Sequence, residues 1–170
     1  MSDSELVCCF TGHRSAQLPW KYNESGERFS IFRENLKQAI IDSINLGYNH
    51  FISGMALGAD MIAAELVLEL KKIYPNLILE CALPCTDQTL KWKEECATRY
   101  EHILSLADKV TFVSKCEHVD GCMAKRNKYM IDNSSRVIAV YNGRKSGGTF
   151  QTINMAKSAN KELIIVNPAL

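Results

Sequence analysis

The sequence predicts one α/β domain over residues 1–170, with three layers: a mainly parallel, doubly wound sheet and helices on both of its faces. Apolar runs of strand length alternate with longer stretches of helical period, which is typical of repeated βα units around a parallel sheet. The length of 170 residues, with 46% hydrophobic and 23% charged side chains, suits one compact core. No repeat, low-complexity tract or interdomain linker divides the chain. We therefore expect a single domain.

In the first half of the chain, short apolar runs predict strands and amphipathic stretches predict helices. Apolar residues that recur every three to four positions line one face of a helix, and a glycine or proline after the last of them ends it. Gly47 and Pro75 occupy such positions. The expected elements are a strand at 6–10, a helix over 29–44, a strand at 50–52 and a helix over 59–74.

The second half continues the same alternation. A third apolar run leads into a turn in which Thr86 or Asp87 can cap the next helix, because their side-chain oxygens accept backbone N–H groups. The polar segment 114–121 predicts a loop. The expected elements are a strand at 77–83, a helix that includes 90–107, a strand at 109–113, a short helix over 122–133, a strand at 136–141, a helix over 149–159 and a strand at 163–166.

The charge balance excludes one class of function. Twenty Lys plus Arg face nineteen Asp plus Glu, which leaves a formal net charge of +1. No global basic field therefore exists to hold a polyanion nonspecifically, and any anion binding must be local.

Cysteine usage and the N-terminal residues predict a compartment. The seven cysteines are odd in number, and several lie in apolar runs where they behave as small buried hydrophobes. A reducing compartment is the simpler interpretation. The first six residues carry acids instead of a basic signal region, and the apolar runs fall well short of a membrane span. We expect a cytoplasmic protein that makes no membrane contact.

Polar and glycine-rich segments follow the first, second, third and fifth predicted strands. In a doubly wound sheet the ligand site lies outside the carboxyl ends of the strands, so these four segments should converge on one rim. The segments are Thr11-Gly12-His13-Arg14, Ser53-Gly54, Pro84-Cys85 and Gly147-Gly148-Thr149.

Two glycine turns on this rim favour an anion. Gly54 and Gly58 bracket one turn, and Gly147-Gly148-Thr149 forms the other; each would let backbone N–H groups approach a phosphate at a helix start. The alternative is that these glycines only shape turns. Neither turn is a Walker A loop, and the dinucleotide pattern G-x-G-x-x-G is absent.

Two arginines are candidates for phosphate binding. Arg14 lies in a strand-end loop, where a guanidinium can pair bidentately with a phosphate, and Arg126 is a second candidate on the short helix before the fifth strand. Solvated surface charges are the alternative interpretation. His13 would donate to a ligand or be a satisfied loop histidine.

The carboxylates and aromatic residues near the rim have two interpretations each. Asp60 complements the dipole of its helix in the default interpretation. Glu65 would bind ribose hydroxyls or act as nucleophile or base at an anomeric carbon, whereas with Glu69 it would form a solvated acidic stripe. Trp92 and Tyr100 would stack on a nucleobase or pack in the core.

A metal site is not predicted. The segment from Cys116 through His118 to Cys122, with Cys81 and Cys85 as further ligands, suggests one, but the spacing matches none of the tight C-x-x-C pairs of structural zinc sites. Cys85 at a helix N-terminus would have a lowered pKa, although no adjacent base is evident.

As a set, the strand-end residues resemble the YpsA-like branch of the SLOG superfamily, which has a Rossmann-like fold and is named for the Smf/DprA and Lonely Guy proteins. The resemblance spans nearly the whole chain, in order, and it is specific only as a set. Its motifs are Thr11-Gly12-His13-Arg14, Ser53-Gly54-Met55-Ala56-Leu57-Gly58-Ala59-Asp60 with Ala64-Glu65, Pro84-Cys85 with Gln88 and Trp92, Arg99-Tyr100, Gly121-Cys122-Met123 with Arg126-Asn127 and Tyr129-Met130, and Gly147-Gly148-Thr149.

The resemblance implies a pocket for a nucleotide-derived ligand: a nucleoside phosphate, an NAD-related molecule or an ADP-ribose derivative. No other cofactor is predicted. Members of the wider superfamily serve as ligand sensors, as DNA-binding recombination mediators or as enzymes that cleave the N-glycosidic bond of nucleoside monophosphates. The expected binding residues are Thr11, Gly12, His13, Arg14, Ser53, Gly54, Met55, Gly58, Asp60, Pro84, Cys85, Gln88, Trp92, Arg126, Asn127, Gly147, Gly148 and Thr149.

Three functions compete. The first is a sensor or regulatory module that binds a nucleotide-derived molecule, with a homo-oligomer and a protein partner as open alternatives. The second is an N-glycosidase that acts on a nucleoside or nucleotide, or a (deoxy)ribosyltransferase. The Lonely Guy hydrolases share a Gly-Gly-x-Gly-Thr-x-x-Glu pattern. In this chain no glutamate follows Gly147-Gly148-Thr149 at that spacing. Glu65 would therefore have to supply the carboxylate. DNA binding is the weakest, because basic residues such as Arg33 and Lys37 are interleaved with acids such as Glu34.

Overall fold

The computed structural model describes residues 6–169 and places six strands in one sheet, all of them parallel. Their order across the sheet is β4-β3-β2-β1-β5-β6, so the chain moves outward in one direction from β1 to β4 and in the other direction from β5 to β6. The strands are β1 (Val7–Gly12), β2 (His50–Ser53), β3 (Ile78–Leu83), β4 (Lys109–Phe112), β5 (Arg136–Val140) and β6 (Glu162–Val166).

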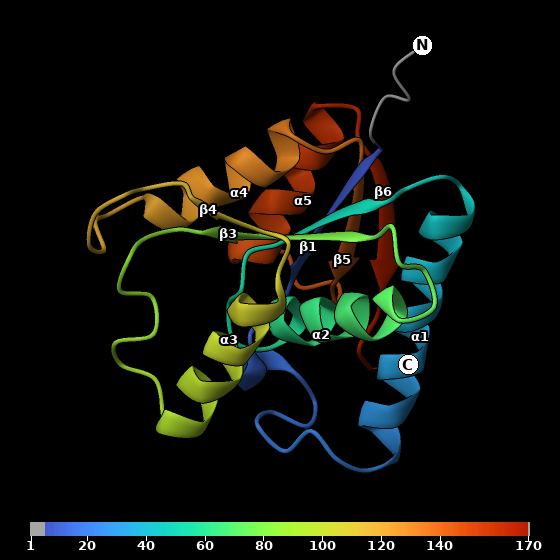
Figure 1. Ribbon diagram of the computed structural model, residues 1–170, viewed down its shortest axis with the longest axis horizontal. Coiled ribbons are helices and arrows are strands. Elements are labelled where there is room, and N and C mark those ends of the chain that lie inside the picture. Colours follow the sequence, from blue (N-terminus) through green and yellow to red (C-terminus); the bar gives the residue numbers. More distant parts are fainter. Residues whose placement is uncertain (1–5, 170) are drawn as a thin grey trace.

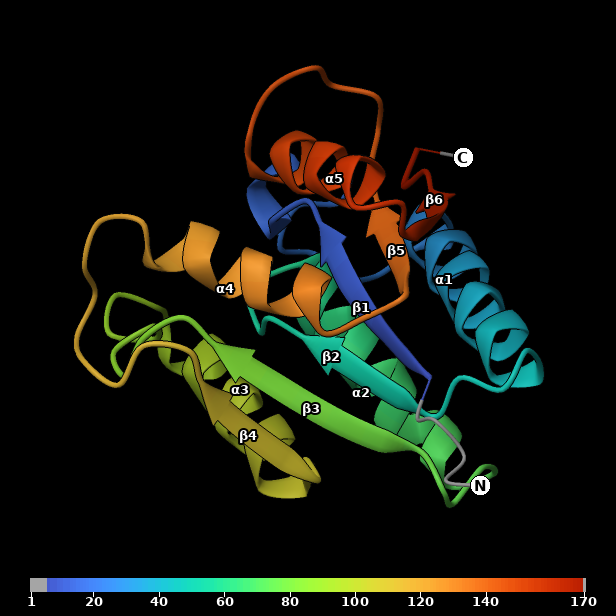
Figure 2. The same cartoon turned by 90° about the horizontal axis from the view of Figure 1, so that it is seen from above.

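Helices cover both faces of the sheet, which confirms the predicted three-layer α/β fold (Figure 1). One face is covered by α1 (Glu27–Asn45), α2 (Ala59–Lys71) and α3 (Glu94–Leu106), and the other by α4 (Cys122–Asp132) and α5 (Gly148–Ser158). Figure 2, seen from above, shows α4 and α5 lying across the sheet, with α2 and α3 behind it. None of the helices within residues 6–169 is long and apolar enough to cross a membrane.

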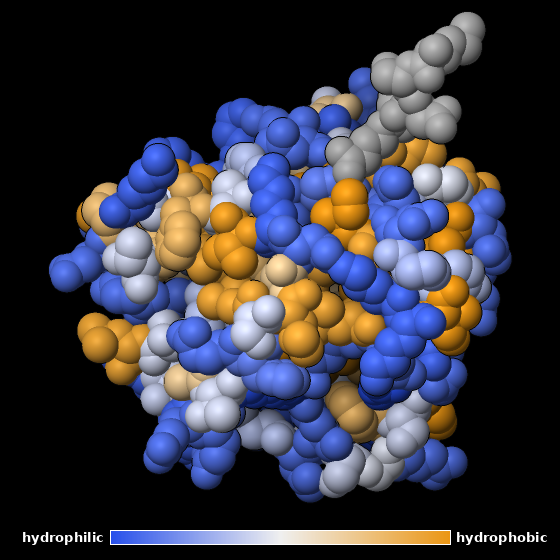
Figure 3. All heavy atoms as spheres, viewed as in Figure 1, coloured by the Kyte–Doolittle hydropathy of each residue, from blue (hydrophilic) through white to orange (hydrophobic). Residues whose placement is uncertain are grey.

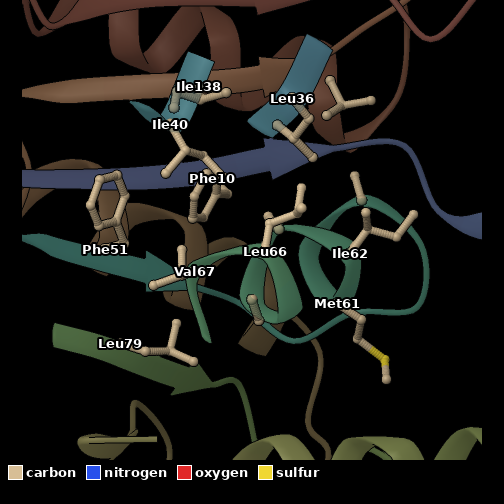
Figure 4. Packing of buried hydrophobic residues seen from close by; sticks show 14 of the residues in the cluster. Phe10, Leu36, Ile40, Phe51, Met61, Ile62, Leu66, Val67, Leu79 and Ile138 are labelled. Atoms are coloured by element: carbon tan, nitrogen blue, oxygen red, sulfur yellow. The ribbon is translucent and has the colours of Figure 1, made fainter. Parts of the chain in front are cut away.

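Strand side chains alternate between two apolar layers, as the pleat of a strand requires. Phe10 and Phe51 point towards α1 and α2, where their rings stack at a centroid distance of 5.9 Å (Figure 4). The neighbouring Cys9 and Ile52 point instead into the smaller cluster beneath α4 and α5. Both faces of the central strands are thus buried, which explains why the strands read as continuous apolar runs.

The helix predicted to include 90–107 begins later than expected. It starts at Glu94, and its N-cap Lys93 makes no side-chain capping bond. Asp87, a predicted cap, is used elsewhere: its Oδ1 accepts the backbone N–H of His118 at 2.7 Å. Residues 84–93 form a loop that leads into α3. Leu90, which the sequence pattern placed on the buried face of this helix, is 76% exposed.

The cysteines are free thiols, and most of them are packing residues as expected. Cys8, Cys9, Cys81, Cys85 and Cys122 are buried. Cys96 is half-buried and Cys116 is exposed. Burial raises the pKa of Cys9 and Cys81 to about 12, so neither thiol ionises near neutral pH.

Apolar side chains interrupt the charged surface. Figure 3 shows the face of Figure 1 in atoms, with hydrophobic groups gathered near its centre among hydrophilic ones. The exposed large apolar residues include Val110 and Phe112 of edge strand β4, which are 39% and 44% exposed. Lys109 in the same strand is a charged residue of the kind that blunts strand-to-strand association.

A buried carboxylate in β3 forms hydrogen bonds to both neighbouring strands, β2 and β4. Glu80 in β3 is 1% exposed, and it accepts hydrogen bonds from His50 at 2.9 Å, Tyr129 at 2.7 Å and Thr111 at 3.2 Å. Burial alone would raise the pKa of Glu80, but the bonds from His50 and Tyr129 lower it from 4.5 to about 2. The carboxylate therefore stays ionised at neutral pH.

Replacing Glu80 with alanine is expected to lower the free energy of unfolding by roughly 3 kcal/mol, because His50, Tyr129 and Thr111 all lose their hydrogen-bond partner in the interior. The wild type should also lose stability as the pH falls from 4.5 towards about 2, since the unfolded chain binds the proton first. Chemical denaturation at pH 7 and pH 3 measures both effects. The control is Glu101→Ala, on an exposed position of α3; equal losses in the two variants would contradict the prediction.

Candidate functional site

A pocket lies at the point where the strand order of the sheet reverses. β1 and β5 are neighbours, but the chain leaves them towards opposite edges of the sheet, and such a switch point leaves a crevice at the carboxyl ends of the strands. The pocket has a volume of about 440 Å³, within the range of small-molecule sites. Its lining residues are Thr11, Gly12, Arg14, Ala16, Gln17, Ala56, Asp60, Met123, Arg126, Asn127, Met130, Gly148 and Thr149.

Eight of the residues expected from the sequence line this pocket, which we call the switch-point pocket. They come from the end of β1 and the loop after it, the start of α2, the middle of α4 and the start of α5. They are Thr11, Gly12, Arg14, Asp60, Arg126, Asn127, Gly148 and Thr149. The other expected residues lie beside the pocket or line a second one.

Arg126 is a buried arginine, not a solvated surface charge. It is 4% exposed, its Nη1 donates to the carbonyl oxygen of Gly54, and its Nε donates to Asn127 Oδ1 at 2.8 Å. A Cβ on Gly54 would lie 2.5 Å from Arg126 Nη1 and 2.7 Å from Cζ. The open side of Gly54 is thus filled by the guanidinium of Arg126 and does not serve the close phosphate approach that the sequence suggested.

Asp60 is the charge partner of Arg126 inside the rim. It is 6% exposed, and its Oδ2 accepts the backbone N–H of Ala56 at 3.3 Å. Burial raises the pKa of Asp60, and the charge of Arg126 opposes that rise. Burial likewise lowers the pKa of Arg126, and Asp60 opposes that fall. Each charge therefore makes the burial of the other less costly.

Ser53 and Met55 shape the turn that holds Asp60. The Ser53 hydroxyl donates to the backbone carbonyl of Asp60 at 2.7 Å and accepts the N–H of Met55 at 3.3 Å. Met55 is fully buried and has a φ of 58°, in the left-handed region. Neither residue lines the switch-point pocket; both act through the backbone of the turn.

Two glycines let α2 pack closely against the loop after β1. A Cβ on Gly12 would lie 2.6 Å from the Ala59 Cβ, and a Cβ on Gly58 would lie 2.6 Å from the backbone N of Ser15. Gly58 also has a φ of 105°. The backbone N–H of Ala59 donates to the His13 carbonyl at 3.1 Å. The start of α2 is therefore occupied in part by the chain itself.

The start of α5 is open. Gly147, the N-cap, has a φ of 93° and provides no side-chain capping bond. A Cβ on Gly147 or Gly148 would meet nothing within 4 Å, and Gly148 and Thr149 line the pocket. Because the first N–H groups of a helix have no intrahelical acceptor, this end of α5 offers donors and a positive dipole to an anion.

His13 is a satisfied loop histidine. It is 4% exposed and does not line the pocket; its Nε2 accepts the backbone N–H of Asn142 at 3.1 Å. Burial lowers its pKa from 6.5, so the neutral ring is favoured at neutral pH. The residue ties the loop after β1 to the loop after β5, on the two sides of the switch point.

Glu65 lies away from the switch-point pocket. It lines a groove between α2 and α3 and pairs with Arg99, which also contacts Glu24 at 2.8 Å. Glu69, one turn further along α2, accepts a bond from Lys37 of α1 at 3.0 Å and pairs with Arg33. These acids link helices. The one carboxylate among the described lining residues of the pocket is that of Asp60.

The loop after β3 lines a second pocket of about 370 Å³. Gln88 donates to the Met55 carbonyl at 3.2 Å, and Trp92 packs edge-on against Tyr100 with a centroid distance of 5.4 Å. Burial and a hydrogen bond with Asp87 raise the pKa of Cys85 to about 11, contrary to the lowering expected at a helix start. The pocket is lined by Cys85, Asp87, Gln88, Leu90, Lys91, Trp92, His118 and Met123. Pro84 is buried beside it.

Sequence reasoning missed several lining residues. Ala16 and Gln17 lie on a short 3₁₀ turn (Ser15–Gln17) after β1, directly beyond the segment Thr11-Gly12-His13-Arg14 that the sequence placed on the rim. Met123 lines both pockets, and its place one turn before Arg126 on α4 was a signal for it. Ala56 and Met130 belong to the motifs of the resemblance, but their apolar side chains have no polar or charged group that would have placed them among the expected binding residues.

Two curated bacterial proteins are similar to this chain in sequence. The chain is 32% identical over 127 residues to a UPF0398 protein from Brevibacillus brevis, covering 74% of this chain and 68% of that one. It is 36% identical over 118 residues to an uncharacterized SPbeta prophage-derived protein, YoqJ, of Bacillus subtilis, covering 63% and 68% of the two chains.

A solved structure has the same fold. DNA processing protein A from Helicobacter pylori, studied for its single-stranded DNA binding mode, superimposes with a TM-score of 0.63 at 19% identity over 96% of this chain. This chain spans 66% of the length of that one. At this identity the likeness concerns the fold.

A family model described as the YspA SLOG family matches residues 8–166. The match runs from the first residues of β1 to the end of β6 and includes each segment that lines the switch-point pocket. The chain therefore belongs to the YpsA family of SLOG proteins.

Proposed function

We propose that the protein binds a nucleotide-derived ligand, such as a nucleoside phosphate, an NAD-related molecule or ADP-ribose, in the switch-point pocket, and that it acts as a sensor or regulatory protein. The observation that carries the proposal is that the open N-terminus of α5 and Arg14 line the same pocket, at the carboxyl ends of β1 and β5. The remaining pocket residues suit the two parts of such a ligand, its phosphate group and its nucleoside.

Three sources of positive potential in the pocket would attract the phosphate group of the ligand. Arg14 is exposed on the rim, so its guanidinium is available to a ligand. Arg126 is buried beneath the pocket and adds a fixed charge. The uncapped first turn of α5 supplies backbone N–H groups. Helix N-termini combined with arginine are a recurring anion site.

The other lining residues would contact the base and the ribose of the ligand. Ala56, Met123 and Met130 give apolar surface on which a base can pack, and methionine adapts to irregular shapes. The Asp60 carboxylate and the Thr11 hydroxyl are acceptors for ribose hydroxyls. A pocket with both kinds of lining suits a ligand that has a charged and a flat apolar part.

The lining favours binding over N-glycoside cleavage. Asp60, the acid present among the described lining residues, already accepts the Ala56 N–H and is beside Arg126. Glu65, the alternative nucleophile, pairs with Arg99 outside the pocket. A regulatory role needs the ligand to be held and released, and it needs no activated nucleophile.

Arg14→Ala is expected to weaken nucleotide binding at least tenfold, because a charge-assisted hydrogen bond contributes about 1.5–3 kcal/mol. Gly148→Val should weaken it more, since Gly148 lines the pocket and a Cβ at this position meets no protein atom within 4 Å, so the new side chain takes up space that the ligand would fill. Isothermal titration with AMP, ATP, NAD and ADP-ribose measures both. Arg28→Ala, an exposed arginine of α1, and Gln151→Val, an exposed position of α5, are the matched controls.

Three results would overturn the proposal: no binding of any of these ligands, losses in the controls equal to those in the pocket variants, or saturable single-stranded DNA binding that Arg14→Ala leaves intact. Release of free base that Glu65→Gln abolishes would instead establish the enzymatic alternative. We expect Glu65→Gln to bind as the wild type does.

Gly54→Ala is expected to lower both stability and nucleotide affinity, because its methyl group would displace the guanidinium of Arg126. Gly148→Ala adds the same methyl group in open space and should leave stability unchanged within about 1 kcal/mol. Thermal unfolding and titration of the two variants measure the difference. Identical unfolding temperatures would show that the guanidinium can move aside without cost.

A further inference from the structure

Two buried thiols and an imidazole converge beside the second pocket. Cys85 comes from the loop after β3, His118 from the loop before α4, and Cys122 is the first residue of α4. The two Sγ atoms and a ring nitrogen of His118 all lie within 4.8 Å of one another, and Cys122 Sγ is 3.3 Å from His118 Nδ1. This set is independent of the switch-point pocket, because none of the three residues lines it.

The separations suit one shared metal ion. With Zn–S and Zn–N bonds of ~2.3 and ~2.05 Å, tetrahedral geometry places two sulfurs ~3.8 Å apart and a sulfur and a nitrogen ~3.6 Å apart. The observed 3.3 Å and the 4.8 Å limit of the cluster bracket these distances.

Backbone hydrogen bonds hold the two loops together. Thr86 in the loop after β3 donates its N–H to the carbonyl of Cys116 in the loop before α4 at 3.1 Å. Within the second loop, the N–H of Cys122 donates to the carbonyl of Val119 at 3.2 Å. Asp87 accepts the backbone N–H of His118 at 2.7 Å. Because these bonds fix the loop that carries His118 against the loop that carries Cys85, the ligands are brought together before any ion arrives.

The donor set selects the kind of ion. Two sulfurs and one imidazole nitrogen are soft and borderline donors, which suit Zn²⁺ and not Mg²⁺ or Ca²⁺. Cys85 and Cys122 are 1% and 2% exposed, so they are shielded from solvent, whereas His118 is exposed and gives an ion access. Cys116, two residues before His118, is exposed and does not belong to the cluster.

We propose that Cys85, His118 and Cys122 bind a zinc-like divalent transition-metal ion at the wall of the pocket that Gln88, Trp92 and Met123 also line. Three protein ligands leave a fourth tetrahedral position for water or for a donor atom of a ligand. Cys85 and His118 both line the pocket, so a molecule bound there can supply that donor. The sequence spacing predicts no metal site; the proximity in space leads us to propose one.

The test titrates Co²⁺, a spectroscopic substitute for Zn²⁺, into the chelator-treated full chain under reducing conditions. We expect one Co²⁺ per chain, with the visible bands of a tetrahedral site and thiolate charge-transfer absorption, and displacement by Zn²⁺. His118→Gln should weaken Co²⁺ binding at least tenfold, and Cys122→Ser should also remove charge-transfer intensity. Cys116→Ser, the matched control, should bind as the wild type does.

A second measurement, of the unfolding temperature, distinguishes loss of metal binding from misfolding of the variant. Zn²⁺ should raise the unfolding temperature of the wild type and of Cys116→Ser but not of His118→Gln, whose exposed position allows the variant to fold. Arg14→Ala should leave the Co²⁺ spectrum unchanged, so failure of nucleotide binding and failure of metal binding are distinguishable. Absence of tetrahedral bands in the wild type, or equal losses in Cys116→Ser and His118→Gln, would refute the site.

Discussion

The guanidinium of Arg126 against the unsubstituted α-carbon of Gly54 is the contact on which the rim of this protein depends. It joins the turn after β2 to α4, and the charge of Asp60 at the start of α2 balances it. Burying a guanidinium is costly unless its donors are satisfied and a counter-charge is near. Here the Gly54 carbonyl, the Asn127 side chain and Asp60 provide both, and the floor of the switch-point pocket is fixed as a result.

The glycines of the rim have two different roles: some allow another part of the chain to approach closely, and one leaves open space at a helix start. Gly12, Gly54 and Gly58 are sites of close approach, where a side chain would overlap β5, Arg126 or the loop after β1. Gly148 faces open space at the start of α5. Only a glycine of the second kind leaves backbone donors exposed to a ligand. The groups of the rim that are free to meet the proposed anion are therefore those of α5 and Arg14, while α2 serves mainly to hold Asp60 in place.

The two pockets differ in the chemistry they offer and share Met123 between them. The switch-point pocket presents arginine and helix N–H groups, which suit hard anionic oxygens. The neighbouring one presents sulfur and imidazole, which suit a borderline metal ion. Met123 is on α4, the helix that begins at Cys122, so residues of one helix line the first pocket and belong to the proposed metal site beside the second.

The sequence by itself determined the alternating α/β order, the parallel three-layer sheet and the segments at its carboxyl edge, because periodicity and glycine placement report local burial and local backbone geometry. It also identified Arg14, Asp60 and Gly148 as residues of the rim. Only the tertiary structure decided that Gly54 receives Arg126, that Glu65 pairs with Arg99 away from the pocket, and that Cys85 meets His118 and Cys122. Those contacts join residues far apart in the chain, and their proximity is set by the order of strands in the sheet, which residue spacing does not encode.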